Sequence, residues 1–90
     1  MDEPLQIRIE PTADPDAVKI TFNRQLEGLG QSFRSAAEAD LNPLAKAILS
    51  IRGVREVFLL GDFMTVRKQI HANWQTLGPA VQAKLHQSLK

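Results

Sequence analysis

Hydrophobic and polar residues alternate in two short segments near the start of the chain. The apolar positions are Leu5, Ile7 and Ile9 in the first segment and Val18, Ile20 and Phe22 in the second. A period of two is typical of strands with one buried face, so we expect strands over residues 5–10 and 17–22. Residues 11–16, PTADPD, are rich in turn-forming proline and aspartate. The two strands are therefore predicted to form a hairpin.

A helix with clear start and stop signals is predicted to begin at Asn42-Pro43. Asparagine is a favourable N-cap, and proline at the first helical position loses no hydrogen bond. One helical face then carries the apolar residues Leu44, Ala47, Ile48 and Ile51. Gly53 is expected to end the helix, because glycine readily adopts the left-handed conformation found just past a helix end.

A second hairpin is predicted over residues 54–60 and 63–68, with Gly61-Asp62 as a two-residue loop in a type II′ turn. In this register one face carries the pairs Leu60–Phe63, Phe58–Thr65 and Glu56–Arg67. The other face carries Leu59–Met64, Val57–Val66 and Arg55–Lys68. Unlike the first hairpin, the second is apolar on both faces.

The remaining segments predict two further pieces of structure. Ser35 and Glu38 fit a capping box, so a short alanine-rich helical turn is expected there, after a loop or irregular edge over residues 23–30. A last helix is predicted from about Trp74, with Asn73 as its cap. Its apolar stripe is Trp74, Leu77, Val81, Leu85 and Leu89. Gly78-Pro79 is expected to kink this helix or delay its regular start.

These elements predict an α/β (α+β) fold in one domain over residues 1–90, since 90 residues are too few for two domains. The expected element order is ββαββα. The simplest architecture is a two-layer sandwich, in which a four-stranded antiparallel sheet has the helices packed on one face. The pattern leaves the strand order open.

A single layer of helices can cover only one face of the second hairpin. If Val57, Leu59, Met64 and Val66 meet the helices, then Phe58, Leu60 and Phe63 lie on the open face, near Arg8, Lys19 and Arg67. Such an exposed apolar cluster beside cations is a candidate partner site. The alternative is that the loop from Gly28 to Phe33 folds over this face and buries it.

Charge and hydropathy exclude several classes of function. The 11 basic and 10 acidic residues nearly cancel, whereas non-specific nucleic-acid binding needs a strong positive field. No apolar run approaches the ~20 residues that cross a bilayer. The acidic first residues lack the apolar segment of a signal peptide. We therefore expect a cytoplasmic protein that binds neither nucleic acid nor membrane.

The chain has no cysteine, which excludes disulfides, a thiol nucleophile and thiolate metal ligands. His71 and His86 are fifteen positions apart, far from the spacing that places two imidazoles on one helical face. Asp62, on an expected turn, has no histidine or second carboxylate near it in sequence. We therefore predict no catalytic residue, no metal site and no enzymatic activity.

Three blocks of the sequence resemble the N-terminal domain of Nfu/NifU-like iron–sulfur scaffold proteins. The first, EPTADPDAVK at residues 10–19, resembles that family's EPTPNPNALK turn. The second runs from Pro43-Leu44-Ala45 through IRGV at 51–54 into VFL at 57–59 and DFMTV at 62–66. The third is Trp74-x-x-Leu77-x-Pro79. The order and spacing of the blocks make the resemblance specific across nearly the whole chain.

The resemblance implies the α/β N-terminal fold and an association with iron–sulfur clusters. In that family a second domain usually carries a Cys-x-x-Cys pair, which holds a bridging cluster between two chains. That site does not transfer, so we expect this chain to bind no cofactor itself. Ala13, Asp14 and Asp16 replace the family's usual proline and asparagines and make the turn more acidic. Any ligand preference of that turn therefore does not carry over.

The favoured hypothesis is a monomeric, non-catalytic accessory domain that contacts a Cys-x-x-Cys scaffold domain or an apo-client during cluster assembly. The candidate partner-binding residues are Thr12, Asp14, Lys19, Phe58, Leu60, Phe63, Arg67 and Lys68. The alternative is a stand-alone regulatory module that binds phosphopeptides or small anions through Lys19, Arg67 and Lys68.

Overall fold

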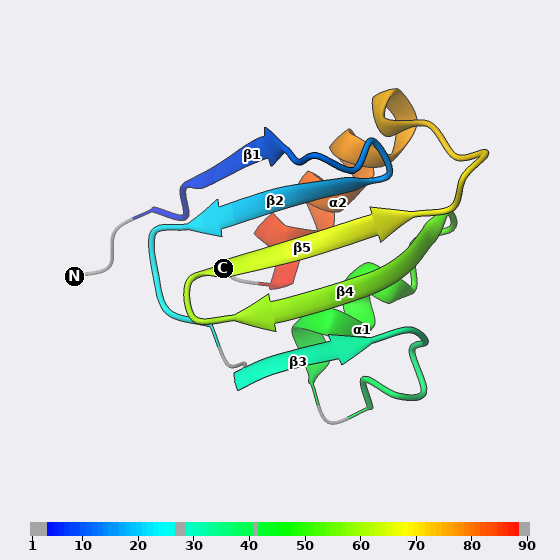
Figure 1. Cartoon of the computed structure of the whole chain (residues 1–90). Coiled ribbons are helices and arrows are strands. Elements are labelled where there is room, and N and C mark those ends of the chain that lie inside the picture. Colours follow the sequence, from blue (N-terminus) through cyan, green and yellow to red (C-terminus); the bar gives the residue numbers. More distant parts are fainter. Residues whose placement is uncertain (1–3, 27–28, 41, 89–90) are drawn as a thin grey trace.

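The computed structural model describes residues 4–26, 29–40 and 42–88, which form a sheet with helices on one face (Figure 1). The strands are β1 (Ile7–Pro11), β2 (Ala17–Phe22), β3 (Leu29–Phe33), β4 (Val54–Leu60) and β5 (Phe63–Lys68), and the helices are α1 (Pro43–Leu49) and α2 (Trp74–Ser88). The five strands are antiparallel and lie in the order β1-β2-β5-β4-β3. The α+β class with antiparallel strands is confirmed.

The expected four strands in the order ββαββα are wrong, because β3 adds a fifth strand before α1. Its sequence, LGQSF, lacks an apolar alternation. An edge strand needs little apolar surface, and the register shifts between Leu29 and Gln31, where Gly30 has φ +78°. The segment pairs with β4 and widens the sheet, so its described residues do not fold over the open face. Gly28 lies outside the described residues.

The first hairpin forms as predicted, with a shifted first strand. β2 has the expected bounds, whereas β1 begins at Ile7 instead of residue 5 and continues through Pro11. Proline is tolerated there because β1 is an edge strand and needs no donor on its outer side.

The second hairpin has the predicted bounds, and its loop is confirmed by the pairing of Leu60 with Phe63. Gly61, the first loop residue, has φ +62°. No described residue other than glycine has positive φ, so Asp62, the second loop residue, has negative φ, as a type II′ turn requires. The predicted Arg55–Lys68 pair is wrong. Val54 pairs with Lys68 and Glu56 with Arg67, so a bulge leaves Arg55 as an extra residue.

The helix caps follow the predicted chemistry more closely than the helix lengths do. The Asn42 side chain accepts from the Ala45 backbone N–H at 3.1 Å, as expected for an N-cap. Helix α1 ends at Leu49, earlier than predicted, with Ser50 as its C-cap. Gly53 has φ +102° and follows the helix by several residues, directly before β4.

The predicted helix starts at Ser35 and Asn73 agree only in part with the structure. The Glu38 backbone donates to the Ser35 hydroxyl at 3.2 Å, but the Glu38 carboxylate accepts from Arg34, one residue earlier than a capping box requires. The segment forms a turn and not a helix. Asn73 caps α2 through the Gln75 N–H at 2.7 Å, and the helix continues through Pro79 without a delayed start.

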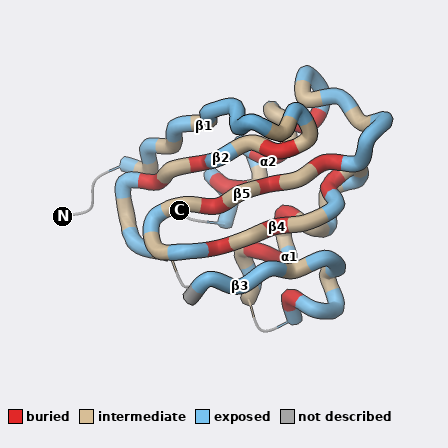
Figure 2. Tube along the Cα trace, in the orientation of Figure 1, coloured by how far each residue is buried: buried red, intermediate tan, exposed pale blue. Residues whose placement is uncertain are grey.

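The core lies between the helices and one face of the sheet, and buried residues alternate with more exposed ones along β5 and most of β2 and β4 (Figure 2). Its largest members are Ile20, Ile48, Val57, Leu59, Met64, Val66, Val81 and Leu85. Leu77 is also buried, as the predicted stripe of α2 requires, whereas Leu89 lies outside the described residues. One sheet face is therefore packed, and the other is left without a helix.

Candidate functional site

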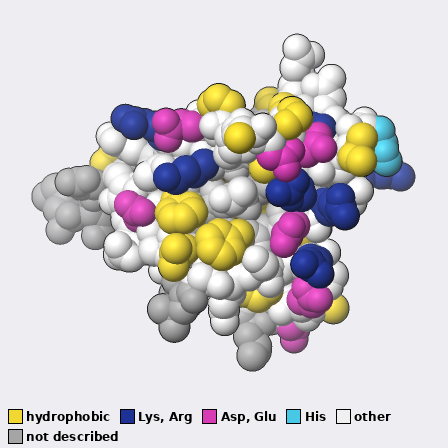
Figure 3. Space-filling view, viewed as in Figure 1, with side chains coloured by type: hydrophobic (Ala, Val, Ile, Leu, Met, Phe, Trp, Pro, Cys, Tyr) yellow, Lys and Arg dark blue, Asp and Glu magenta, His cyan; other side chains and the backbone are white. Residues whose placement is uncertain are grey.

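Three apolar side chains lie on the open face of the sheet, as the predicted register requires. They are Phe58 and Leu60 of β4 and Phe63 of β5, and we call them the apolar patch. Leu60 is 42% exposed and the two phenylalanines are partly exposed. The phenyl centroids are 6.2 Å apart with the rings tilted by 46°. Figure 3 shows hydrophobic side chains gathered in the middle of this face.

Lys19 borders the apolar patch from the neighbouring strand β2. Its Nζ lies 4.8 Å from the Phe63 ring centroid, within the range of a cation–π interaction. Four of the predicted partner-binding positions therefore lie together on one surface: Lys19, Phe58, Leu60 and Phe63.

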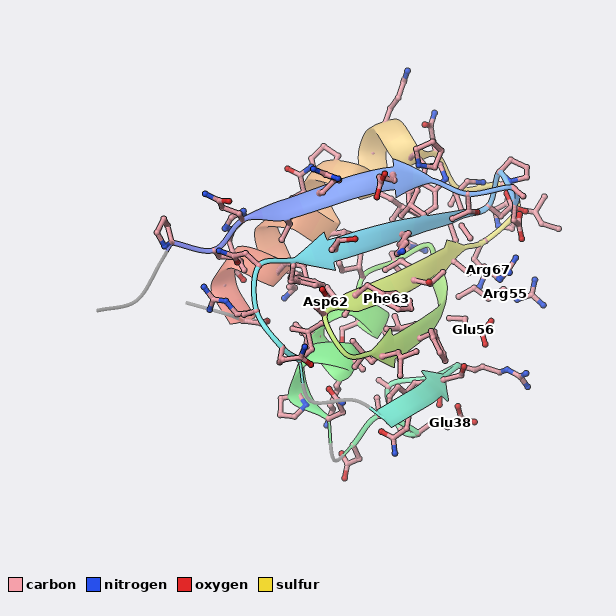
Figure 4. All side chains as sticks on the ribbon, turned by 60° about the vertical axis from the view of Figure 1, so that its left-hand side comes forward. Glu38, Arg55, Glu56, Asp62, Phe63 and Arg67 are labelled. Carbon is pink, nitrogen blue, oxygen red and sulfur yellow. The ribbon has the colours of Figure 1, made fainter. Side chains whose placement is uncertain are left out.

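Farther along β4 and β5, charged side chains form a chain of ion pairs. The Glu56 carboxylate lies 3.7 Å from Arg34 Nε and 3.6 Å from Arg67 Nε. Arg67 also pairs with Asp14, in the turn between β1 and β2. Figure 4 shows Arg55, Glu56 and Arg67 gathered at the same end of the two strands.

These residues line two neighbouring pockets on the open face. One, of about 200 Å³, is lined by Glu56, Phe58, Thr65 and Arg67. The other, of about 650 Å³, is lined by Arg34, Val54, Arg55, Glu56, Arg67 and Gln69. Both pockets are lined by Glu56 and Arg67, so they are adjacent, and we call the two together the β4/β5 trough.

The turn at residues 11–16 is held by its own hydrogen bonds. The Thr12 hydroxyl lies 3.0 Å from the carbonyl oxygens of Asp14 and Ala17 and accepts from the Asp14 N–H at 3.1 Å. The Asp14 carboxylate accepts from the Asp16 N–H at 2.8 Å. Thr12, a predicted binding residue, thus has its hydroxyl committed to the turn.

Two contacts perturb the charge of Asp14. The Asp16 backbone N–H, and then the Arg67 guanidinium, hold the pKa of the Asp14 carboxyl below its ordinary value of 3.8. The same ion pair, with Asp14 as the acceptor, raises the pKa of Arg67. The ionised Asp14 carboxylate therefore stabilises the folded state relative to the unfolded state.

We expect Asp14→Asn to lower the free energy of unfolding at neutral pH. Because the folded pKa is depressed, the contribution of the carboxylate is present above about pH 4 and is lost as the pH falls through the folded pKa. The difference from the wild type should therefore narrow below about pH 4 in urea titrations run from pH 7 downward. Asp62→Asn is the control, because Asp62 forms no ion pair with a described residue. If the difference in unfolding free energy between Asp14→Asn and the wild type stays constant with pH, the lowered pKa assigned to Asp14 is wrong.

Lys68 does not join Lys19 and Arg67. Its side chain lies on the helix side of the sheet, is 9% exposed, and donates to Asp16 Oδ1 at 2.8 Å. The carbonyl oxygens of Gln69 and Ile70 lie 3.4 and 3.3 Å from its Nζ. We assign Lys68 a structural role, since its ammonium group is occupied.

Sequence reasoning missed six residues that line the trough: Arg34, Val54, Arg55, Glu56, Thr65 and Gln69. The predicted cross-strand pair of Glu56 with Arg67 could have identified Glu56 as a residue of the site. A regular register would place Arg55 on the helix face, and the bulge changes its direction. Arg34 was missed because the strand that precedes it was not predicted.

Metal ligands are sparse in the part of the chain that the structure describes. No three histidine, aspartate or glutamate side chains are grouped there closely enough to hold a metal ion. With no cysteine in all 90 residues, the donor set does not fit a cluster held by thiolates. Among the described helices, none is both long and apolar enough to cross a bilayer.

A family model for "Scaffold protein Nfu/NifU N terminal" matches residues 7–90. The chain belongs to this family. The "NFU1 iron-sulfur cluster scaffold homolog, mitochondrial" proteins of Drosophila persimilis and Drosophila grimshawi are each 35% identical to it over 79 residues, or 86% of this chain. The Nfu/NifU N-terminal chain spans only 28% and 26% of the lengths of those two proteins.

Solved structures show the same fold. The crystal structure of protein SAV1430 from Staphylococcus aureus has a TM-score of 0.79 and 29% identity, covering 89% of this Nfu/NifU N-terminal chain and 98% of that one. The NifU-like protein from Saccharomyces cerevisiae has a TM-score of 0.75 and 19% identity, covering 94% and 78%. At 19% identity, the yeast protein supports the fold alone.

Proposed function

We propose that this chain is a non-catalytic protein-interaction domain in iron–sulfur cluster assembly, and that its open sheet face contacts the partner. The observation that carries the proposal is the apolar patch at the centre of a face without helices. A domain this small gains stability from each buried apolar side chain, so large apolar side chains left partly exposed favour a contact surface.

The family gives the proposal its biological setting. The Nfu/NifU N-terminal family is defined on scaffold proteins, and the Drosophila relatives are named as iron–sulfur cluster scaffold homologues. The absence of cysteine supports an accessory role in which the partner holds the cluster. The expected partner is a domain with a Cys-x-x-Cys pair or an apo-client that receives the cluster.

Titration of the ¹⁵N-labelled chain with a Cys-x-x-Cys scaffold domain, and separately with an apo-client, tests the proposal. We expect amide shifts concentrated at Phe58, Leu60 and Phe63. Leu60→Asp should weaken binding at least about tenfold, because it places a charge in the contact without altering the core. The measurement is the dissociation constant from the titration.

Ile70→Asp is the matched control, because Ile70 is 75% exposed and lies on the loop after β5, outside the patch. It should leave the affinity unchanged. Equal losses in both variants, or no shifts with any assembly component at high concentration, would refute the proposed surface.

A second candidate function is a stand-alone module that binds anions or phosphopeptides. The observation in its favour is that Arg34, Arg55 and Arg67 line one pocket. Against a doubly charged phosphate group, Glu56 and Asp14 already offset two of the three positive charges at this pocket. Tighter binding of a phosphopeptide than of any assembly component would favour this second function.

A further inference from the structure

We propose that the β4/β5 trough binds an extended acidic segment of the partner, with an apolar side chain on the apolar patch and a carboxylate between Arg34 and Arg55. This inference rests on the proposed function, because it names the chemistry of the partner's contact. It adds a second point of recognition, at the charged end of the trough, to the contact at the patch.

The bulge in β4 supplies the cation for this second point. A regular strand would place Arg55 on the face opposite Glu56, against the helices. The register shift between Val54 and Glu56 leaves Arg55 as an extra residue, and it lines the trough together with Glu56 and Arg67. Bulges commonly redirect a side chain in this way next to functional sites. Arg55 is exposed and forms no ion pair with a described residue.

Arg34 is also available to an incoming carboxylate. Its side chain is 78% exposed, and its Nε lies 3.7 Å from the Glu56 carboxylate. An exposed ion pair at that distance contributes little to stability, so Arg34 can turn toward a partner at small cost. Arg67 is held in position by its ion pairs with Asp14 and Glu56, so it forms the fixed wall of the site.

The charge of the trough selects a carboxylate. Three guanidinium groups and one carboxylate line the charged end, which leaves +2. Asp14, paired with Arg67, reduces this to +1. One partner carboxylate balances that charge. A phosphate group carries about −1.5 to −2 and would also face the Glu56 carboxylate.

The dimensions favour an extended segment. Four residues of one strand, β4, line the trough in chain order, namely Val54, Arg55, Glu56 and Phe58, so the site is elongated along an extended strand. Leu60 and Glu56 are four residues apart on β4, or about 13 Å. We therefore expect the apolar and acidic side chains of the partner to be about four residues apart in an extended chain.

Fluorescence anisotropy with four labelled twelve-residue peptides tests this inference. Each peptide carries a Phe-Leu pair, followed four residues later by Glu-Gln, Gln-Gln, Lys-Gln or phosphoserine-Gln. We expect the glutamate peptide to bind about tenfold tighter than the glutamine and lysine peptides, and no weaker than the phosphoserine peptide.

Arg55→Gln should weaken binding of the glutamate peptide about tenfold and leave the glutamine peptide unchanged. Arg52→Gln is the matched control, because Arg52 is exposed and lines a different pocket. Circular dichroism of both variants checks that they fold. Equal binding of the glutamate and glutamine peptides, tighter binding of the phosphoserine peptide, or no effect of Arg55→Gln would overturn the inference, and so would failure of all four peptides to bind.

The two proposals fail in different ways. If the peptides bind without regard to charge while Leu60→Asp still abolishes partner binding, the acidic contact is wrong and the docking face stands. If Leu60→Asp has no effect on partner binding but Arg55→Gln weakens the glutamate peptide, the trough is an acidic-peptide site and the proposed partner surface is wrong.

Discussion

Leu59→Ala is expected to lower the free energy of unfolding by about 3 kcal/mol, because it removes a large side chain from a closed core. Leu59 is 0% exposed and lies on the packed face of β4, opposite Met64 of β5. In a domain of this size the loss corresponds to a fall in melting temperature of about 12–24 °C. Urea denaturation with an unchanged m-value is the measurement.

The neighbouring residue supplies the control. Leu60→Ala makes the same chemical change one position along the strand, where the side chain points to the open face and is 42% exposed. We expect it to cost less than about 1 kcal/mol, since little apolar area returns to water. Equal losses at the two positions would mean that the open face is as well packed as the core, and the proposed docking surface would fail with it.

Asp16→Ala is expected to cost about 3 kcal/mol, because it leaves the buried Lys68 ammonium without its carboxylate. The Asp16–Lys68 bond measures 2.8 Å, and the two carbonyl oxygens that remain near Lys68 Nζ are at 3.3 Å or more. Chemical denaturation of the variant at pH 7 is the measurement. Adding Lys68→Met to the same chain should recover much of the loss, since no unpaired charge is then buried.

The Asp40–Lys46 pair is the matched control for this prediction. It has nearly the same length, 2.9 Å, but both side chains are exposed. Asp40→Ala should therefore leave the melting temperature close to that of the wild type. If Asp16→Ala is equally mild, then water reaches Lys68 and its role in stability is smaller than its burial indicates.

The second hairpin shows how much of the fold local sequence determines. Alternation on both strands and a two-residue loop beginning with Gly61 fix the register near the turn, and the predicted pairs from Leu60–Phe63 to Glu56–Arg67 all form. The bulge beyond them inserts one residue, and composition does not reveal it. Strand β3 was missed because an edge strand that contributes little to the core needs no clear apolar period.

The candidate site also has one part that local sequence determines and one part that it does not. The apolar patch was predicted because its members follow directly from strand parity. The charged end of the trough was not, because Arg55 owes its direction to the bulge and Arg34 follows the missed strand. Lys68 was grouped with Arg67 as a binding residue, although adjacent residues on a strand point to opposite faces.

Because Arg67 and Lys68 point to opposite faces of the sheet, the turn at residues 11–16 has two independent anchors. Asp14 is tied to the open face through Arg67, and Asp16 to the packed face through Lys68. The Trp74 indole N–H adds a third tie, donating to the Pro15 carbonyl at 3.0 Å. Loss of the Arg67–Asp14 contact, for example in a variant at Arg67, leaves the other two ties in place. Selection or engineering can therefore alter the charges of the recognition face while the architecture beneath it keeps its shape.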